Sequence, residues 1–382
     1  MNGSARAPPR RIGRYLAAAP ILLWSLPMIP PLASLPPVAA IVEQWRFDAM
    51  YQLRDVKVPL RHSLYGIAWL DELCAKITAA FGVLQFHEDS RFYWQSLDFV
   101  SEAGALYSIY LLEATKNTAS ALPFLATIVA FMLAQLSTAG FILPMYLYVL
   151  HIRTRPSASV GAATQYGQHS KLGLAVLPTV ALTFYVPHFN SFLRPDLTTR
   201  HWWNWIWQAF PVWGFGGVPA FYVMFSILFG LLQRLPKSLS IKVQRQTRSK
   251  AMRLTAVSIG MINVATYWYT MGKSGFSWKD IYVPRRWVAT SSDPEEVLGL
   301  LIQADGICSF GSTITWLAFQ IWDLKTMGLM RMSWARIVLA AVAIMAMFGP
   351  GALCWVGWMA REEMLASMAS ELSRPAHEKK VV

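Results

Sequence analysis

Charged side chains are scarce in this chain. Asp, Glu, Lys and Arg make up 14% of its 382 residues, whereas hydrophobic residues make up 55%. Soluble globular proteins carry about 25% charged residues. The mean hydropathy of +0.36 points the same way. The composition therefore excludes an ordinary soluble protein and predicts a polytopic membrane protein.

Cysteine is rare, and paired aspartates are missing. Cys74, Cys308 and Cys354 lie in apolar surroundings without the spacing of metal ligands, so neither disulfides nor a zinc site is expected. No Asp-Asp pair occurs anywhere in the chain. This absence excludes the aspartate-rich magnesium motif for diphosphate ionisation and the Asp-x-Asp-Asp motif of soluble protonating cyclases. We expect no metal and no cofactor.

Positive charge exceeds negative charge, with a formal net charge of +13 at pH 7. The basic residues lie in short gaps between apolar runs, which is the positive-inside pattern of membrane proteins and not a nucleic-acid surface. The gap at 234–253 contains Lys and Arg but no Asp or Glu. We therefore place this gap in the cytoplasm.

The apolar runs predict an all-α, polytopic transmembrane helical bundle of seven to nine spans, at roughly 20 residues for each crossing. The first run is rich in proline, and we interpret it as a bent membrane anchor. The second run contains charged residues, so it is either a span or an interfacial helix. We expect a basic cytoplasmic N-terminus (1–14), a transmembrane domain (15–361) and a polar C-terminal tail (362–382). The candidate spans are 15–35, 60–81, 96–112, 121–150, 172–187, 205–232, 251–271, 297–321 and 335–359.

The C-terminus bears on the topology. The chain ends Lys379-Lys380-Val381-Val382, the form of an endoplasmic reticulum retrieval signal that works only in the cytoplasm. Nine spans from a cytoplasmic N-terminus would put this end in the lumen, so either the match is chance or one span is miscounted. We expect an integral multi-pass protein of the endoplasmic reticulum. The side of the C-terminus and the oligomeric state stay open.

Carboxyl groups inside apolar runs are the most informative residues. Glu102 lies in the run 99–112, and Asp305 lies in the run 297–321. An ionisable group at bilayer depth costs about 3 kcal/mol or more, so it is rarely kept without a partner, a cavity or a function. Asp98 and Glu113 share a helical face with Glu102, because four residues advance a helix by about 40° beyond a full turn and eleven by about 20° beyond three turns. The alternative for Asp98 and Glu113 is that they are the interfacial ends of their helix.

The helix that contains Asp305 has a polar stripe. Ser309 and Trp316 follow Asp305 on the same face. We expect Asp305 and Glu102 to line one pocket without touching. The alternative is a buried acid whose only role is a hydrogen bond with a neighbour.

Aromatic residues are abundant, with 17 Trp, 14 Tyr and 20 Phe. The Trp cluster at 202–207 lies at a span end and fits an interfacial aromatic belt. Trp213, Tyr222, Trp268 and Trp316 are expected to lie deeper. Ring faces in a desolvated pocket stabilise a carbocation.

The stretch Leu193-Arg194-Pro195-Asp196 leads into Trp202-Trp203-Asn204-Trp205 and then Phe210-Pro211-Val212-Trp213-Gly214. Together with acids in apolar helices, it resembles the fungal integral-membrane terpene cyclases of meroterpenoid pathways, those making ascochlorin, ascofuranone and macrophorin-type products. The resemblance covers residues 43–359. It implies a farnesylated aromatic or quinone substrate, often with a terminal epoxide, and no metal.

A carboxyl group in an apolar pocket keeps its proton and can deliver it to an epoxide or an olefin. We hypothesise that Asp305 or Glu102 starts the reaction in this way. A second carboxylate, for which Asp98 is the candidate, or the Tyr107 hydroxyl removes the final proton. The residues expected to contact the folded prenyl chain are Trp268, Trp316, Tyr222, Trp213, Tyr107 and Ser309.

Other classes of function stay open. In a transporter or exporter, Glu102 and Asp305 would relay protons or bind the substrate, although no internal repeat is visible. A seven-helix receptor is a third class. A membrane O-acyltransferase would depend on His188 and Asn190, but a lone His at a span end is more often an interfacial hydrogen-bonding residue.

Overall fold

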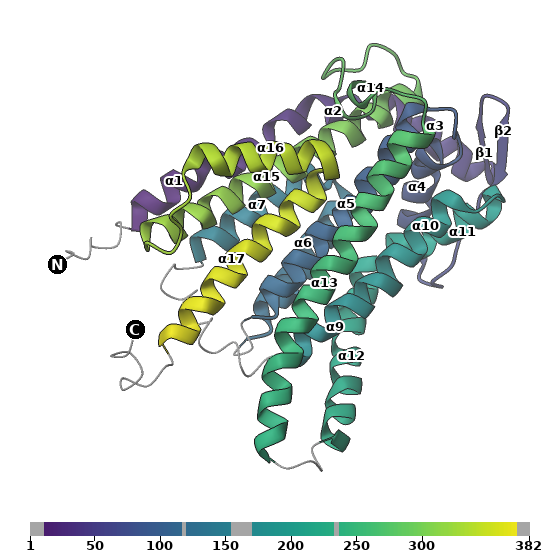
Figure 1. Cartoon of the computed structure of the whole chain (residues 1–382). Coiled ribbons are helices and arrows are strands. Elements are labelled where there is room, and N and C mark those ends of the chain that lie inside the picture. The colour runs from purple at the N-terminus through teal and green to yellow at the C-terminus, as the bar shows by residue number, and fades with distance from the viewer. Residues whose placement is uncertain (1–10, 117–119, 154–169, 233–236, 373–382) are drawn as a thin grey trace.

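The structure is a computed structural model that describes residues 11–116, 120–153, 170–232 and 237–372. Helices pack into an elongated bundle with a small β-ribbon at one end (Figure 1). In chain order the elements are α1 (Arg11–Leu23), a 3-10 turn η1 (Leu26–Met28), α2 (Ile29–Ala33), α3 (Pro36–Phe47), β1 (Met50–Leu53), β2 (Val56–Pro59), α4 (Ala68–Gln85), α5 (Arg91–Ala114), α6 (Leu122–Leu136), α7 (Ala139–Arg153), α9 (Ser170–Val180), a π-helical turn η2 (Ala181–Tyr185), α10 (Val186–Leu193), α11 (Leu197–Gln208), α12 (Phe210–Leu232), α13 (Lys237–Lys273), α14 (Trp278–Tyr282), α15 (Pro294–Thr326), α16 (Trp334–Phe348) and α17 (Pro350–Leu372).

The helical fold class is confirmed, and the β-ribbon is an addition that the sequence did not indicate. Strands β1 and β2 pair antiparallel, with Tyr51 opposite Val58. The Tyr51 hydroxyl lies 2.8 Å from His87 Nε2, which fixes the ribbon to the segment before α5.

Helix α5 runs through the centre of the bundle and contacts α4, α6, α9, α13, α15 and α17. Ser90 caps its start by accepting a hydrogen bond from the amide of Phe92. Helix α15 starts with Asp293 as its N-cap and Pro294 in its first turn, positions where these residue types favour a helix start. The Ser90 hydroxyl also donates to Glu295 Oε1 over 2.6 Å, so the starts of α5 and α15 are held together.

The prediction of seven to nine spans is not supported. Three helical segments of the described chain are long and apolar enough to cross a membrane: Gly13–Ala33, Phe210–Leu228 and Pro294–Thr326. The predicted span 121–150 is broken after Leu136 into α6 and α7, and the span 335–359 is broken at Gly349. Each of α6, α7 and α16 has 15 residues, which is about 22 Å at 1.5 Å per residue and short of the ~30 Å hydrocarbon core.

Two segments predicted from the sequence to lie outside the spans are helical in the structure. Helix α17 continues to Leu372 and contains buried Arg361 and Glu362, so the predicted tail boundary at 361/362 falls inside a helix. The basic gap at 234–253 is mostly the first part of α13, which begins at Lys237. Residues 1–10 and the dilysine at Lys379 and Lys380 lie outside the described residues.

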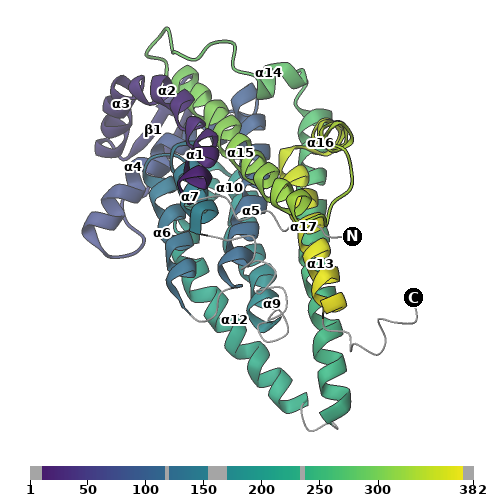
Figure 2. The same ribbon diagram turned by 90° about the vertical axis from the view of Figure 1, so that its left-hand side faces the viewer.

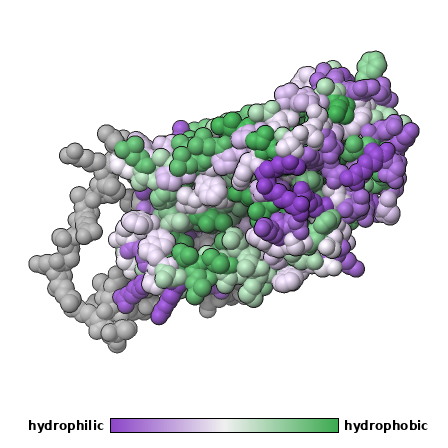
Figure 3. Space-filling view, turned by 90° about the horizontal axis from the view of Figure 1, so that it is seen from above, coloured by the Kyte–Doolittle hydropathy of each residue, from purple (hydrophilic) through white to green (hydrophobic). Residues whose placement is uncertain are grey.

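The outside of the bundle is uneven. Helices α12 and α13 extend beyond the other helices at one end, as the two ribbon views agree (Figures 1 and 2). Seen from above, apolar side chains cover much of the surface, and hydrophilic side chains gather toward the end with the β-ribbon (Figure 3). Helix α16 has no buried residue. This distribution fits contact with lipid over part of the bundle and contact with water at its ends.

The junction between α16 and α17 gives a test of the fold. Gly349 has φ +87° and ψ 166°, a region essentially restricted to glycine, and a Cβ there would overlap Glu102 Oε1. We expect Gly349→Ala to lower the free energy of unfolding by about 2 kcal/mol or more, measured by thermal unfolding in detergent. Gly260→Ala is the control, because nothing lies within 4 Å of its Cβ position in α13, and alanine favours a helix. Equal unfolding temperatures for the two variants would contradict this assignment.

Candidate functional site

A cavity of about 250 Å³ lies between α4, α5, α6 and α15, and residues of η2, α11 and α12 complete its wall. Aromatic rings form a continuous part of that wall. The centroid of Phe184 lies 4.8 Å from that of Phe210 and 5.7 Å from that of Trp207, and Trp207 lies 5.7 Å from Phe81. The aromatic lining residues are Phe81, Phe131, Phe184, Trp207 and Phe210.

Among the described residues, Asp305 is the only carboxyl residue that lines this cavity. It lies on α15 and is 7% exposed. Its Oδ1 accepts a hydrogen bond from the amide of Gly140 in the first turn of α7. Gly140 is suited to this contact, because a Cβ would lie 2.9 Å from the same oxygen. The carboxyl group therefore has one oxygen at the positive end of a helix, while the residue borders the cavity.

Further polar groups border the cavity. Gln135 and Thr138 line it from the break between α6 and α7. Their Nε2 and Oγ1 atoms are buried and have no hydrogen-bond partner, and neither has the Nε1 atom of Trp207. An apolar cavity with a few unpaired polar groups is the usual form of a small-molecule site. In the sequence, Gln135-Leu136-Ser137-Thr138 interrupts the apolar run 121–150 with polar residues. The prediction of one span over this run overlooked the interruption.

Asp98 and Glu102 form a second buried group on α5, with exposed fractions of 0% and 1%. The hydroxyl of Tyr282 in α14 donates to Asp98 Oδ2 over 2.6 Å, and the ring of Tyr282 stacks on that of Tyr267 in α13. Asp98 Oδ1 and Glu102 Oε1 have no hydrogen-bond partner. Two carboxyl groups one turn apart in a dry site cannot both ionise readily, so the pair holds at least one proton.

The expectation that Glu102 and Asp305 line one pocket is wrong for this cavity. Helix α5 meets the cavity through Val100 and Ala103, and neither Asp98 nor Glu102 is part of the wall. Positions 100 and 103 lie on a different helical face from 98 and 102, at about 100° per residue. The two acid groups are therefore separate sites.

The aromatic residues predicted from the sequence lie elsewhere. Trp213, Tyr222 and Trp268 are 40%, 39% and 55% exposed, and none of the three lines this cavity. They lie on outward faces, where a membrane protein also keeps apolar rings. Trp316 is 1% exposed and packs beside Tyr110, away from the cavity wall.

Tyr107 and Ser309 lie close to the cavity without lining it. The ring of Tyr107 packs against Phe131 and Phe210 at 4.7 and 4.9 Å between centroids, so it supports the wall from behind. Its hydroxyl and the Ser309 hydroxyl are buried without a hydrogen-bond partner. Trp207 was missed because it belongs to the cluster assigned to the interfacial belt. It is 6% exposed.

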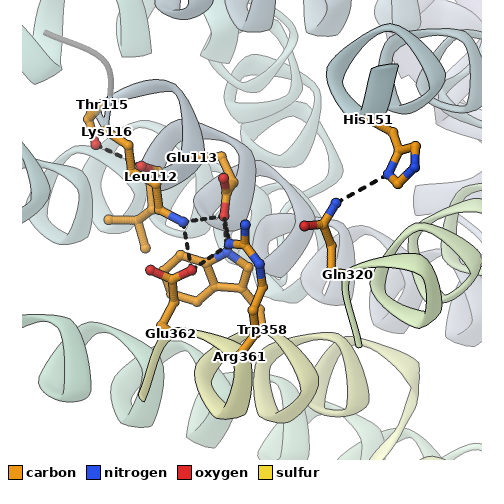
Figure 4. Close-up of polar contacts among 9 residues, drawn as sticks. All are labelled: Leu112, Glu113, Thr115, Lys116, His151, Gln320, Trp358, Arg361 and Glu362. Carbon is orange, nitrogen blue, oxygen red and sulfur yellow. Dashed lines mark hydrogen bonds and ion pairs between the residues drawn. The ribbon is translucent and has the colours of Figure 1, made fainter. Parts of the chain in front are cut away.

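Glu113 lies at the end of α5, and Figure 4 shows its polar contacts. Its Oε1 accepts from Lys116 Nζ, from Trp358 Nε1 over 2.6 Å and from Arg361 Nη1 over 2.8 Å. Glu362 accepts from the same two cations. These ion pairs join α5 to α17. Beyond them, Gln320 of α15 lies 3.3 Å from His151 of α7 (Figure 4).

His188 and Asn190 give no support to the acyltransferase alternative. His188 is fully buried, and its Nε2 lies 3.0 Å from the carbonyl oxygen of Leu97. The Asn190 amide donates to the carbonyl of Val186 on its own helix. Both side chains therefore have local structural contacts.

Fold and site together give a helical bundle in which three described helices could cross a membrane, with buried carboxyl groups and a cavity lined by aromatic rings. The chain belongs to the CtvD-domain family, whose domain matches residues 47–366. This family places it among proteins of fungal secondary-metabolite biosynthesis. No solved structure matches the chain.

Two curated relatives are named FAD-dependent monooxygenases. VerC1 of Penicillium polonicum is 27% identical over 271 residues, which cover 69% of this chain and 32% of the relative. AnuJ of Penicillium roqueforti is 24% identical over 369 residues, which cover 94% of this chain and 43% of the relative. The chain thus spans less than half the length of these relatives. Neither relative is named a terpene cyclase, so the resemblance is confirmed only as far as fungal secondary metabolism.

The residues of this chain do not fit FAD. The sequence contains no G-x-G-x-x-G fingerprint, and the sheet of the described residues is a two-stranded ribbon and not a parallel βαβ unit. The described residues also contain no cluster of three or more His, Cys, Asp or Glu side chains suited to a metal ion. We therefore derive no flavin step for this chain.

The different surroundings of Glu113 and Glu102 give a prediction about stability. Glu113→Gln leaves Lys116 and Arg361 with less compensating charge, so we expect a loss of about 3 kcal/mol. Glu102 has no ion pair in the described chain, and Glu102→Gln keeps its shape, so we expect a change within about 1 kcal/mol. Thermal unfolding in detergent measures both. A larger loss for Glu102→Gln than for Glu113→Gln would show that the assignment of the two roles is wrong.

Proposed function

We propose that this protein is a membrane-bound cyclase that opens an epoxide, or protonates a terminal alkene, on a prenylated aromatic or quinone substrate and closes the chain into a ring. The observation that carries the proposal is the carboxyl group of Asp305 on the wall of an aromatic cavity. Membership of a family of fungal secondary metabolism supports the setting.

The names of the relatives support an epoxide substrate. A flavin monooxygenase transfers one oxygen atom from O₂ to its substrate, and on an alkene this transfer gives an epoxide. This chain matches one part of these longer proteins. Its reaction would then follow the oxygen transfer and use the epoxide as substrate. This chain would then supply acid chemistry, and the oxygen transfer would take place on another polypeptide or domain.

The proposed step starts at Asp305. Its carboxyl O–H passes the proton to the epoxide oxygen while the bond from that oxygen to the more substituted carbon breaks. The π electrons of a neighbouring double bond form the new carbon–carbon bond, and the positive charge moves along the chain. Loss of a proton from the last cation to the Asp305 carboxylate gives a cyclic alcohol isomeric with the epoxide.

The surroundings suit both halves of this step. The Asp305 carboxylate that forms after proton transfer keeps the Gly140 amide as a donor at the start of α7, and helix N-termini stabilise negative charge. The rings of Phe184, Trp207 and Phe210 supply faces for the moving cation, an interaction that gains strength when water is excluded. Asp98, Glu102 and Tyr107 lie outside the wall, so their predicted catalytic roles stay predictions.

The first test replaces the proposed acid. We expect Asp305→Asn to lower turnover about 10²–10⁴-fold, which is the usual contribution of a general acid. The assay incubates microsomes that contain the protein with an epoxidised farnesyl-phenol, and the product is analysed by mass spectrometry and NMR. The control is Asp89→Asn, an exposed aspartate. A wild-type product of unchanged mass supports cyclisation.

Other outcomes overturn parts of the proposal. A product heavier by one water would replace cyclisation by hydrolysis. Full activity in Asp305→Asn together with an inactive Glu102→Gln would move the acid to the second buried group. Unaltered wild-type substrate, with the non-epoxidised chain also unaltered, would leave the transporter as the better function.

The aromatic wall gives a second test. Phe184→Leu removes a ring from the centre of the wall, so we expect turnover to fall about 3–30-fold, as for the loss of a cation–π contact of about 0.5–2 kcal/mol. Phe47→Leu is the matched control, because Phe47 is 84% exposed. Equal turnover in the two variants would mean that the cavity wall takes no part in the reaction.

A further inference from the structure

A second pocket, of about 300 Å³, lies where α5 and α15 begin. Three arginines line it: Arg91 in the first turn of α5, and Arg285 and Arg286 in the segment between α14 and α15. Phe92 and Leu300 provide an apolar floor. The pocket is separate from the cavity at Asp305, and no part of the proposed function uses it.

The charges in this pocket do not balance. Arg285 pairs with Asp280 at 2.6 Å, and Arg286 pairs with Glu296 at 3.2 Å. Arg91 has no ion pair among the described residues, and its guanidinium lies 4.6 Å from the ring centroid of Phe92. Burial, followed by repulsion from Arg285, lowers the pKa of Arg91. One positive charge is therefore left for an anion.

The pocket is also rigidly built. Gln303 of α15 donates to the carbonyl oxygens of Asp280 and Ile281, the latter over 2.7 Å. Glu296 accepts from the amide of Thr290 and from the hydroxyl of Ser291. These bonds hold the segment with Arg285 and Arg286 against the first turns of α15, so binding an anion needs little reorganisation.

The position of the pocket indicates where its ligand comes from. Helix α15 is a candidate membrane span from Pro294 onward, so its first turns would lie at the level of lipid headgroups if it crosses a bilayer. Trp287 and Val288, directly after the two arginines, are 38% and 55% exposed. Exposed Trp beside Arg is typical of the membrane interface, where basic pockets bind phosphate headgroups.

We propose that this pocket binds a phosphate group, carried by an anionic lipid headgroup or by a soluble phosphate ester, with Arg91 as the principal contact. Guanidinium groups bind phosphate through two parallel hydrogen bonds. The apolar floor suits the carbon atoms next to the phosphate. Binding there would fix the start of α15, the helix that carries Asp305.

The test uses the full chain in detergent at constant ionic strength. The probes are dihexanoyl phosphatidic acid, dihexanoyl phosphatidylcholine and inorganic phosphate, and the readouts are binding affinity and thermal unfolding. We expect phosphatidic acid to raise the unfolding temperature and Arg91→Gln to weaken its binding about tenfold or more, as for a hydrogen bond to a charged group. Arg285→Gln, at an exposed position, should weaken binding without affecting folding, and Arg336→Gln on α16 is the matched control.

The probes separate the two sources of phosphate. A preference for phosphatidic acid over inorganic phosphate supports a lipid headgroup, and equal affinity supports a soluble ester. The proposal is overturned if no phosphate probe binds, or if Arg91→Gln and Arg285→Gln both bind as tightly as the Arg336→Gln control.

Discussion

The contact between the Asp305 carboxyl group and the Gly140 amide is the interaction on which the candidate site depends. It joins α15, a candidate membrane span, to the start of α7. It requires a glycine, since a Cβ at position 140 would meet both Asp305 and Cys308. The break between α6 and α7 places this amide where it is, and the same break brings Gln135 and Thr138 to the cavity. One interruption in an apolar run therefore gives Asp305 its amide donor and brings two polar side chains to the cavity.

Asp305, the pair Asp98 and Glu102, and Glu113 have three different kinds of surroundings. The Asp305 carboxyl group accepts a hydrogen bond at the N-terminus of α7, and the residue lines the cavity. Asp98 and Glu102 form a cation-free pair with a tyrosine hydroxyl. Glu113 has two cations and a tryptophan N–H. A buried carboxylate with matched cations is a structural feature, because removing either partner leaves an uncompensated charge. A carboxyl group without a cation retains its proton more easily. Of the two groups without a cation, Asp305 is the one that lines the cavity, so we assign the chemistry to Asp305.

The sequence predicted the helical class and the burial of Glu102 and Asp305, because composition and carboxyl groups in apolar runs are local signals. It failed where packing decides. Nine apolar runs suggested spans, but Gly349 and the segment Ser137-Thr138 end helices inside two of them. Trp268 and Trp207 show the same limit: periodicity does not say which face of a helix meets lipid and which meets the core. The cavity wall was therefore predicted from the wrong rings.

An experimental structure with a bound cation mimic tests the central claim most directly. A farnesyl-phenol analogue with a nitrogen in place of the terminal tertiary carbon carries an ammonium group where the cyclising chain would first be positive. The account predicts that the ammonium lies within hydrogen-bond distance of an Asp305 oxygen, with the prenyl chain against Phe184, Trp207 and Phe210. An ammonium bound at Asp98 and Glu102, with the cavity at Asp305 empty, would contradict it.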